Sequence, residues 1–152
     1  MTKQEFLDFC HEEFTKRGFT KKRKNMYYLQ GKDFLCGLYL QKSMADAYYI
    51  NCDYFFSEFS CTKYPTTYEA DWSRRLVVLS KDTINGEHFM GAMWCYEDYI
   101  KEEMLPYLEK EFDEHVMPAL MKGKKYLIPQ IEASRGWTAE EKVRILEKLR
   151  ES

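Results

Sequence analysis

The chain has 152 residues, and we expect residues 1–152 to form a single domain that buries roughly two thirds of its unfolded surface. The net charge of −2 gives no overall field that would draw the chain to nucleic acid or to a membrane surface. No apolar run approaches the roughly 20 residues that span a bilayer. The acidic, amphipathic start does not resemble a signal peptide. With five cysteines and no C-x-x-C pair, the sequence predicts reduced thiols and a cytoplasmic protein.

The first predicted element is a helix over residues 3–17. Thr2 and Glu5 fit a capping box at its start. Apolar residues then recur at helical spacing, at Phe6, Phe9, Cys10 and Phe14. Gly18 can adopt the left-handed conformation that ends a helix, and Phe19 would then pack back on the last turn. The sequence therefore predicts an amphipathic helix with defined ends.

Alternation of polar and apolar side chains predicts three strands, over residues 25–30, 33–41 and 47–56. Short turns separate them, at Gly31-Lys32 and at residues 43–46. A fourth strand is predicted over residues 74–80. The period of two gives an antiparallel sheet with one covered face and one more open face.

The rest of the chain predicts loops and helices. Residues 57–72 follow no period, and residues 82–89 predict a loop with a turn at Asn85-Gly86. Helical spacing resumes near residue 95 and runs to Pro118, with Pro106 either kinking this helix or starting a second one.

After Gly123, residues 126–137 predict a connector with a short edge strand. A second capping box at Thr138 and Glu141 opens a final helix. The predicted class is α+β: an antiparallel sheet of about four to five strands, with the N-terminal helix and the C-terminal helices packed against it.

Residue types that commonly carry catalysis do not form a recognisable motif. The histidines, His11, His88 and His115, lack the spacing of a zinc site. Three cysteines, Cys10, Cys36 and Cys52, fall on apolar faces, whereas Cys61 and Cys95 are not assigned to a face. Acidic pairs on the long helix are expected to be solvated. We predict no metal and no cofactor, and the sequence favours a protein that is not an enzyme.

A basic run over residues 16–24 holds six cations and no acid. Lys16 and Arg17 suit the negative end of the first helix. The rest, Lys21, Lys22, Arg23 and Lys24 beside aromatic residues, are the candidates for contact with single-stranded nucleic acid. A basic turn that only keeps the chain soluble is the favoured interpretation, so nucleic acid is not the expected partner.

The open sheet face holds the main candidate site. By alternation, Tyr39, Gln41, Tyr49, Asn51 and Asp53 should point together, with Arg74 or Arg75 contributed by the fourth strand. Such a set can orient a small polar ligand or the backbone of a protein partner. The competing interpretation is a polar face whose internal Arg–Asp pair only holds the strands in register.

Several short motifs resemble those of the uncharacterised bacterial family catalogued as domain of unknown function 4304. These are Gly18-Phe19 with Lys21-Lys22, Gln41-Lys42-Ser43, Asn51 within an extended segment, and Arg74-Arg75 in a strand. The resemblance covers about residues 3–120. It implies the fold of that family and no reaction, because the family has no settled activity.

The leading functional hypothesis is a non-catalytic cytoplasmic binding or protein-interaction module that uses the polar-aromatic sheet face. The alternative is a hydrolase or nucleic-acid-acting enzyme built around Asp53, Arg74 and Arg75, with a histidine brought in by the fold. Neither hypothesis predicts membrane association. The oligomeric state is not predicted.

Overall fold

The computed structural model describes residues 1–56 and 63–152. The helices are α1 (Lys3–Lys16), α2 (Lys101–Glu111), α3 (Met117–Lys122), α4 (Lys124–Ala133) and α5 (Ala139–Glu151). A π-helical segment, η3 (Phe112–Val116), joins α2 to α3, and two 3₁₀ turns are η1 (Thr67–Glu69) and η2 (Tyr96–Asp98). The strands are β1 (Thr20–Arg23), β2 (Met26–Gln30), β3 (Leu35–Lys42), β4 (Tyr48–Phe55), β5 (Trp72–Arg75), β6 (Val78–Ile84), β7 (Glu87–Gly91) and β8 (Met93–Trp94).

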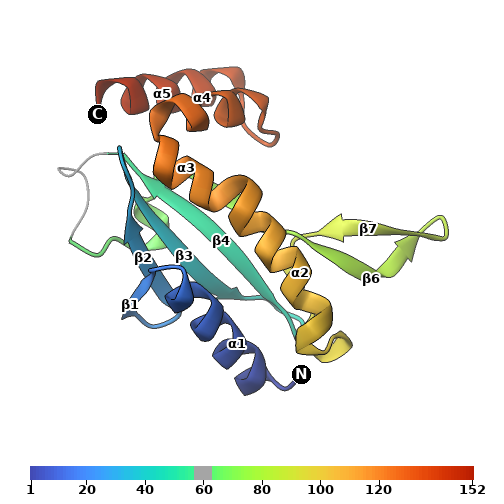
Figure 1. The fold of residues 1–152 in the computed structure, drawn as a ribbon. Coiled ribbons are helices and arrows are strands. Elements are labelled where there is room, and N and C mark those ends of the chain that lie inside the picture. Colours follow the sequence, from blue (N-terminus) through green and yellow to red (C-terminus); the bar gives the residue numbers. More distant parts are fainter. Residues whose placement is uncertain (57–62) are drawn as a thin grey trace.

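The predicted α+β class is confirmed. The main sheet has six strands: β1 to β5 pair antiparallel in chain order, and β8 pairs with β4. Figure 1 shows α1, α2 and α3 crossing one face of this sheet, while β6 and β7 form a separate ribbon that projects away from it. Within residues 1–56 and 63–152, no helix is both long and apolar enough to cross a bilayer.

The core lies between the sheet and the helices. Alternation in β3 and β4 turns one set of apolar side chains toward α1 and α2, as predicted: Cys36, Leu38, Leu40, Ile50, Cys52 and Tyr54. These meet Phe6 and Phe14 from α1 and Met104 and Leu108 from α2, all fully buried. Burial of these groups supplies the main driving force for this packing.

Both predicted ends of α1 are confirmed. The backbone N–H of Glu5 donates to the Thr2 hydroxyl at 3.1 Å, and the Glu5 carboxylate accepts from the Thr2 backbone at 3.2 Å. At the other end Gly18 has a φ of +97°, which only glycine adopts readily. The N–H of Phe19 bonds the carbonyl of Phe14 at 3.2 Å, and its ring enters the core. This is the Schellman ending that the sequence predicts.

The predicted strand over residues 74–80 is wrong as one element. Leu76 still donates to the carbonyl of Ile50 in β4, but the N–H of Val77 turns to the Glu111 carboxylate at 3.3 Å. The chain therefore leaves the sheet, and β6 starts at Val78 as part of the ribbon. The loop predicted over residues 82–89 is also wrong, except for the turn itself: Asn85 and Gly86 have φ values of 53° and 80°.

The C-terminal half contains two further differences. Helix α2 starts at Lys101 and Pro106 lies inside it, so this proline does not start a second helix. The connector with an edge strand predicted over residues 126–137 is wrong, because most of it belongs to α4. The Asp33 carboxylate accepts from the N–H of Lys124 at 2.7 Å and so caps the first turn of α4. Leu127 and Ile131, four residues apart, then bury one face of the helix.

Candidate functional site

The face of the sheet opposite α1 and α2 is called the back face here. One part of it is covered by residues 63–71. Tyr64 and Ala70 pack on a small apolar cluster of Met26, Tyr28 and Phe55, and the Tyr28 hydroxyl donates to the carbonyl of Pro65 at 2.7 Å. The rest of the back face holds the polar side chains that the sequence predicts.

A polar ladder of Gln41, Asn51 and Arg75 crosses β3, β4 and β5 on this face. The Asn51 amide donates to Oε1 of Gln41 at 2.8 Å, and Nε of Arg75 donates to Oδ1 of Asn51 at 3.3 Å. The guanidinium carbon of Arg75 lies 3.8 Å from the ring centroid of Tyr49, within cation–π range. The ladder therefore fixes the orientation of an exposed arginine.

Tyr39 lies next to the polar ladder, where β3 pairs it with Met26 on one side and Asn51 on the other. Its side chain is half-buried against the small apolar cluster. The structure thus brings together Tyr39, Gln41, Tyr49, Asn51 and Arg75 on the back face, because residues two apart in a strand share a face.

Arg74 does not join this set, because its neighbour Arg75 occupies the back face and successive side chains alternate. It lies on the core side of β5, where Nη2 is 3.2 Å from the Glu111 carboxylate of α2. Burial raises the pKa of Glu111, and Arg74 partly counteracts this. His115 lies 3.9 Å from the other Glu111 oxygen; burial lowers its pKa, and Arg74 lowers it further. This cluster ties the sheet to α2.

Asp53 points to the back face but is fully buried, so its carboxylate is not presented to solvent. The Ser73 hydroxyl donates to Oδ1 at 2.6 Å, while Oδ2 has no hydrogen-bond partner in the described residues. Burial raises the pKa of Asp53 to about 6, although the nearby Ser73 and Thr67 hydroxyls lower it. The Arg–Asp pair considered from the sequence does not form, since Arg74 pairs with Glu111 and Arg75 with Asn51.

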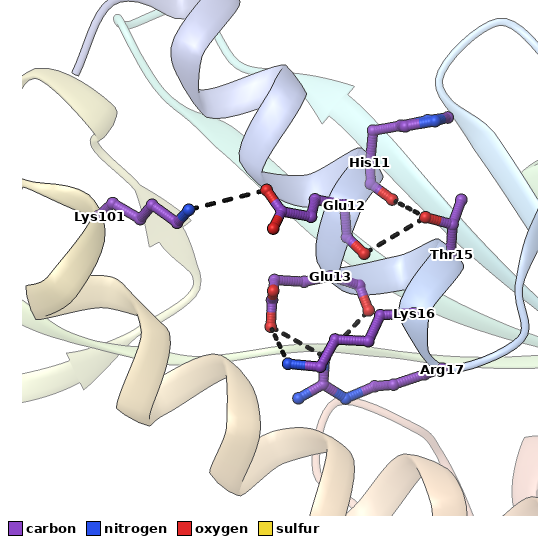
Figure 2. A network of polar contacts seen from close by, with 7 residues as sticks. All are labelled: His11, Glu12, Glu13, Thr15, Lys16, Arg17 and Lys101. Atoms are coloured by element: carbon purple, nitrogen blue, oxygen red, sulfur yellow. Dashed lines mark hydrogen bonds and ion pairs between the residues drawn. The ribbon is translucent and has the colours of Figure 1, made fainter.

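The start of the basic run stabilises the end of α1. Figure 2 shows Glu13 facing Lys16 and Arg17, and Glu12 facing Lys101. Nη1 of Arg17 donates to the carbonyl and the carboxylate of Glu13, at 2.9 and 3.1 Å, and its guanidinium lies 4.5 Å from the ring centroid of Phe112. Arg17 is therefore a structural residue that connects α1 to η3.

The later part of the basic run forms a strand that the sequence did not predict. Lys21, Lys22 and Arg23 lie in β1, at the edge of the sheet, and are exposed, as is Lys24 after them. Nζ of Lys22 and Nζ of Lys63 each lie 5.5 Å from the ring centroid of Tyr64, and Arg23 donates to the carbonyl of Tyr64 at 2.6 Å. Sequence analysis missed the contribution of Lys63 and Tyr64 because they lie about 40 residues downstream.

The remaining candidates for catalysis lie apart from Asp53. Nδ1 of His88 contacts the carbonyl of Ser80 at 2.9 Å. His88 lines a hollow of about 270 Å³ at the base of the ribbon, together with Leu79, Ser80, Lys81, Tyr99, Glu103 and Tyr107. Cys61 lies outside the described residues. In the described parts of the chain, no three His, Cys, Asp or Glu side chains gather in a way that could hold a metal ion.

Comparison with known proteins identifies a family. The family model described as Domain of unknown function (DUF4304) matches residues 10–122, which run from the middle of α1 to the end of α3 and include the polar ladder. No curated protein and no solved structure matches the chain.

Proposed function

The chain belongs to the DUF4304 family, whose function is unknown, and we propose that it is a non-catalytic binding module that uses the open part of the back face. The observation that carries this proposal is the polar ladder. Nε of Arg75 bonds Asn51 and its guanidinium stacks on Tyr49, so the side chain is ordered before any ligand arrives. A pre-ordered side chain loses less entropy on binding, which suits a recognition site.

The alternative enzyme receives no support from the geometry. It needs Asp53, Arg74, Arg75 and a histidine within reach of one another. Asp53 is buried and faces the back of the sheet. Arg74 and His115 lie on its other side, beside Glu111, and His88 is in the ribbon. We therefore favour binding without chemistry at this surface.

We further assign the module to the cytoplasm of a bacterial cell. The family resemblance noted from the sequence implies a bacterial source. Cys10, Cys36 and Cys52 are buried as free thiols, a state that suits a reducing compartment.

Affinity capture tests the proposal with the full chain as bait, in lysate of cells that encode it. The Arg75→Gln variant should lose a partner that the wild type retains, because it removes the fixed charge and leaves the fold intact. Arg135→Gln, the same change at an exposed arginine between α4 and α5, should retain it. If both variants capture what the wild type captures, the back face is not the binding surface.

A further inference from the structure

The polar ladder points to a particular class of ligand. Resting on the function proposed above, we propose that the ligand is an extended acidic segment of a partner protein. One carboxylate of this segment binds Arg75, and its backbone pairs with the outer edge of β5.

The first argument is the unused hydrogen-bonding capacity of Arg75. Its Nε is engaged by Asn51 and one guanidinium face by Tyr49, which leaves the two Nη groups as an open fork. Among residues 1–56 and 63–152, no carboxylate forms an ion pair with Arg75. Eight other basic side chains each pair with one: Lys16, Arg17, Arg74, Lys81, Lys101, His115, Lys148 and Arg150. Two parallel N–H groups match the two oxygens of a carboxylate.

The second argument is the sign of charge on the back face. Among the residues that alternate onto this face in β1 to β5, the sole carboxyl is Asp53, which is fully buried. The exposed charges there are Arg75 at one end and the Lys22, Arg23 and Lys63 group at the other. The segment that covers this face also carries Glu69, which is half-buried and whose carboxylate accepts from the N–H of Thr66 at 2.7 Å. The back face is thus positive although the whole chain carries −2. An acidic partner meets a complementary surface.

The third argument concerns the edge of the sheet, and it favours a protein over a nucleic acid. Directly after β5, the backbone N–H of Leu76 donates to the carbonyl of Ile50 in β4. Backbone groups alternate in direction along an antiparallel strand, so the N–H and C=O groups of Ser73 and Arg75 point away from β4. Neither has a backbone partner beyond β5 in the described chain, since β5 ends the sheet order. An added strand would satisfy these groups, and only a polypeptide offers the matching N–H and C=O pattern.

The two features lie together, because Arg75 supplies both the outward peptide group and the guanidinium. A strand laid along β5 alternates its side chains, so every second residue faces the same side as Arg75. The guanidinium of Arg75 leans inward over Tyr49 of β4, so a segment on the outer edge needs the longer side chain of glutamate at one of these positions to reach the fork.

Amide chemical shifts of the ¹⁵N-labelled full chain test this inference. The probe is a blocked peptide of about six residues with alternating valine and glutamate. We expect this peptide to change the chemical shifts of the backbone amides of Ser73 and Arg75 and of the side-chain amide of Gln41. A matched peptide with glutamine in place of glutamate should bind about tenfold more weakly or worse, as should the acidic peptide with alternate backbone nitrogens methylated.

Arg75→Gln should weaken the binding of the acidic peptide by a similar factor, and Arg135→Gln should leave it unchanged. If the acidic peptide leaves these amides unmoved at millimolar concentration, the inference is overturned. It is equally overturned if the glutamine peptide binds as well, or if an oligo-thymidine strand moves the same amides more strongly than the peptide. Each of these results leaves the proposed function intact, provided that Arg75→Gln still loses a partner that the wild type captures. If wild type and Arg75→Gln capture the same proteins, both proposals are overturned.

Discussion

Ser73 and Asp53 face each other across β5 and β4, and the serine hydroxyl donates a 2.6 Å hydrogen bond to the carboxyl. This bond only partly offsets the cost of burying the charged carboxylate, so the pKa of Asp53 rises from 3.8 to about 6. The folded protein therefore holds the Asp53 proton more tightly than the unfolded chain does. The stabilisation from this proton is complete below about pH 4 and is lost as the pH rises through about 6.

Asp53→Asn should remove this pH dependence. An amide carries no charge to bury, so at pH 8 the variant should be more stable than the wild type by up to about 3 kcal/mol. At pH 4 the two should differ little. Urea unfolding at both pH values measures the difference, with Asp113→Asn, at an exposed carboxyl, as the control. Equal pH dependence in wild type and Asp53→Asn would mean that Asp53 is charged at little cost in the folded state.

Tyr54→Phe should stabilise the protein. The Tyr54 hydroxyl is buried without a hydrogen-bond partner in the described residues, and the neighbouring Cys52 thiol is a poor one. Removing an unpaired buried hydroxyl is expected to gain about 1 kcal/mol in the free energy of unfolding. Tyr28→Phe is the matched change, and it should lose about 1 kcal/mol because its hydroxyl donates to Pro65 at 2.7 Å. Urea unfolding measures both variants, and changes of the same sign in their free energies of unfolding would contradict this account.

Arg74 and Glu111 should be energetically coupled. Their side chains are 21% and 7% exposed, so losing one partner leaves the other largely desolvated. A double-mutant cycle with Arg74→Met and Glu111→Gln should give a coupling free energy of about 1–3 kcal/mol. The Arg150 and Glu132 pair, 54% and 55% exposed, is the comparison and should give less than about 0.5 kcal/mol. A coupling as small at Arg74 as at Arg150 would show that water screens the inner pair.

Gly123→Ala should destabilise the protein more than Gly86→Ala. Both glycines have positive φ values, of 73° and 80°. Alanine is strained by about 1 kcal/mol at Gly86 and more strongly at Gly123, whose ψ of −145° lies in a region essentially restricted to glycine. At Gly86 a methyl group meets nothing within 4 Å, whereas at Gly123 it would overlap the Asp33 carboxylate that caps α4. The thermal midpoint should therefore fall further for Gly123→Ala. Equal shifts would contradict both the larger backbone strain at Gly123 and the overlap of its new methyl group with Asp33.

Local signals were enough to predict α1 and the central strands. The capping box at Thr2 lies within four residues, and the alternation in residues 35–42 and 48–55 is set by the period of the strand itself. The same alternation correctly placed Gln41, Asn51 and their neighbours on one face. It also separates Arg74 from Arg75, although the sequence alone did not fix which of the two would face outward.

Features that depend on distant residues were missed. Helix α4 contains Pro129, and its N-terminus is capped by Asp33, which lies 91 residues earlier. The spacing of Leu127 and Ile131 was therefore not enough to predict this helix. The sheet pairing of this segment ends after β5, where the N–H of Val77 donates to the Glu111 carboxylate of α2 instead. The cover over Asp53 likewise comes from a separate segment, and alternation could not foresee that this carboxyl is buried.

Strand β1 makes one edge of the main sheet unfavourable for pairing with a second copy of the chain. A second copy of the chain that approached along β1 would bring its own Lys21, Lys22 and Arg23 against the same three cations. Like charges at an edge discourage pairing between sheets, which is a common protection against aggregation. We therefore expect the basic run to disfavour self-association at this border, which leaves the β5 border as the edge for pairing with another chain.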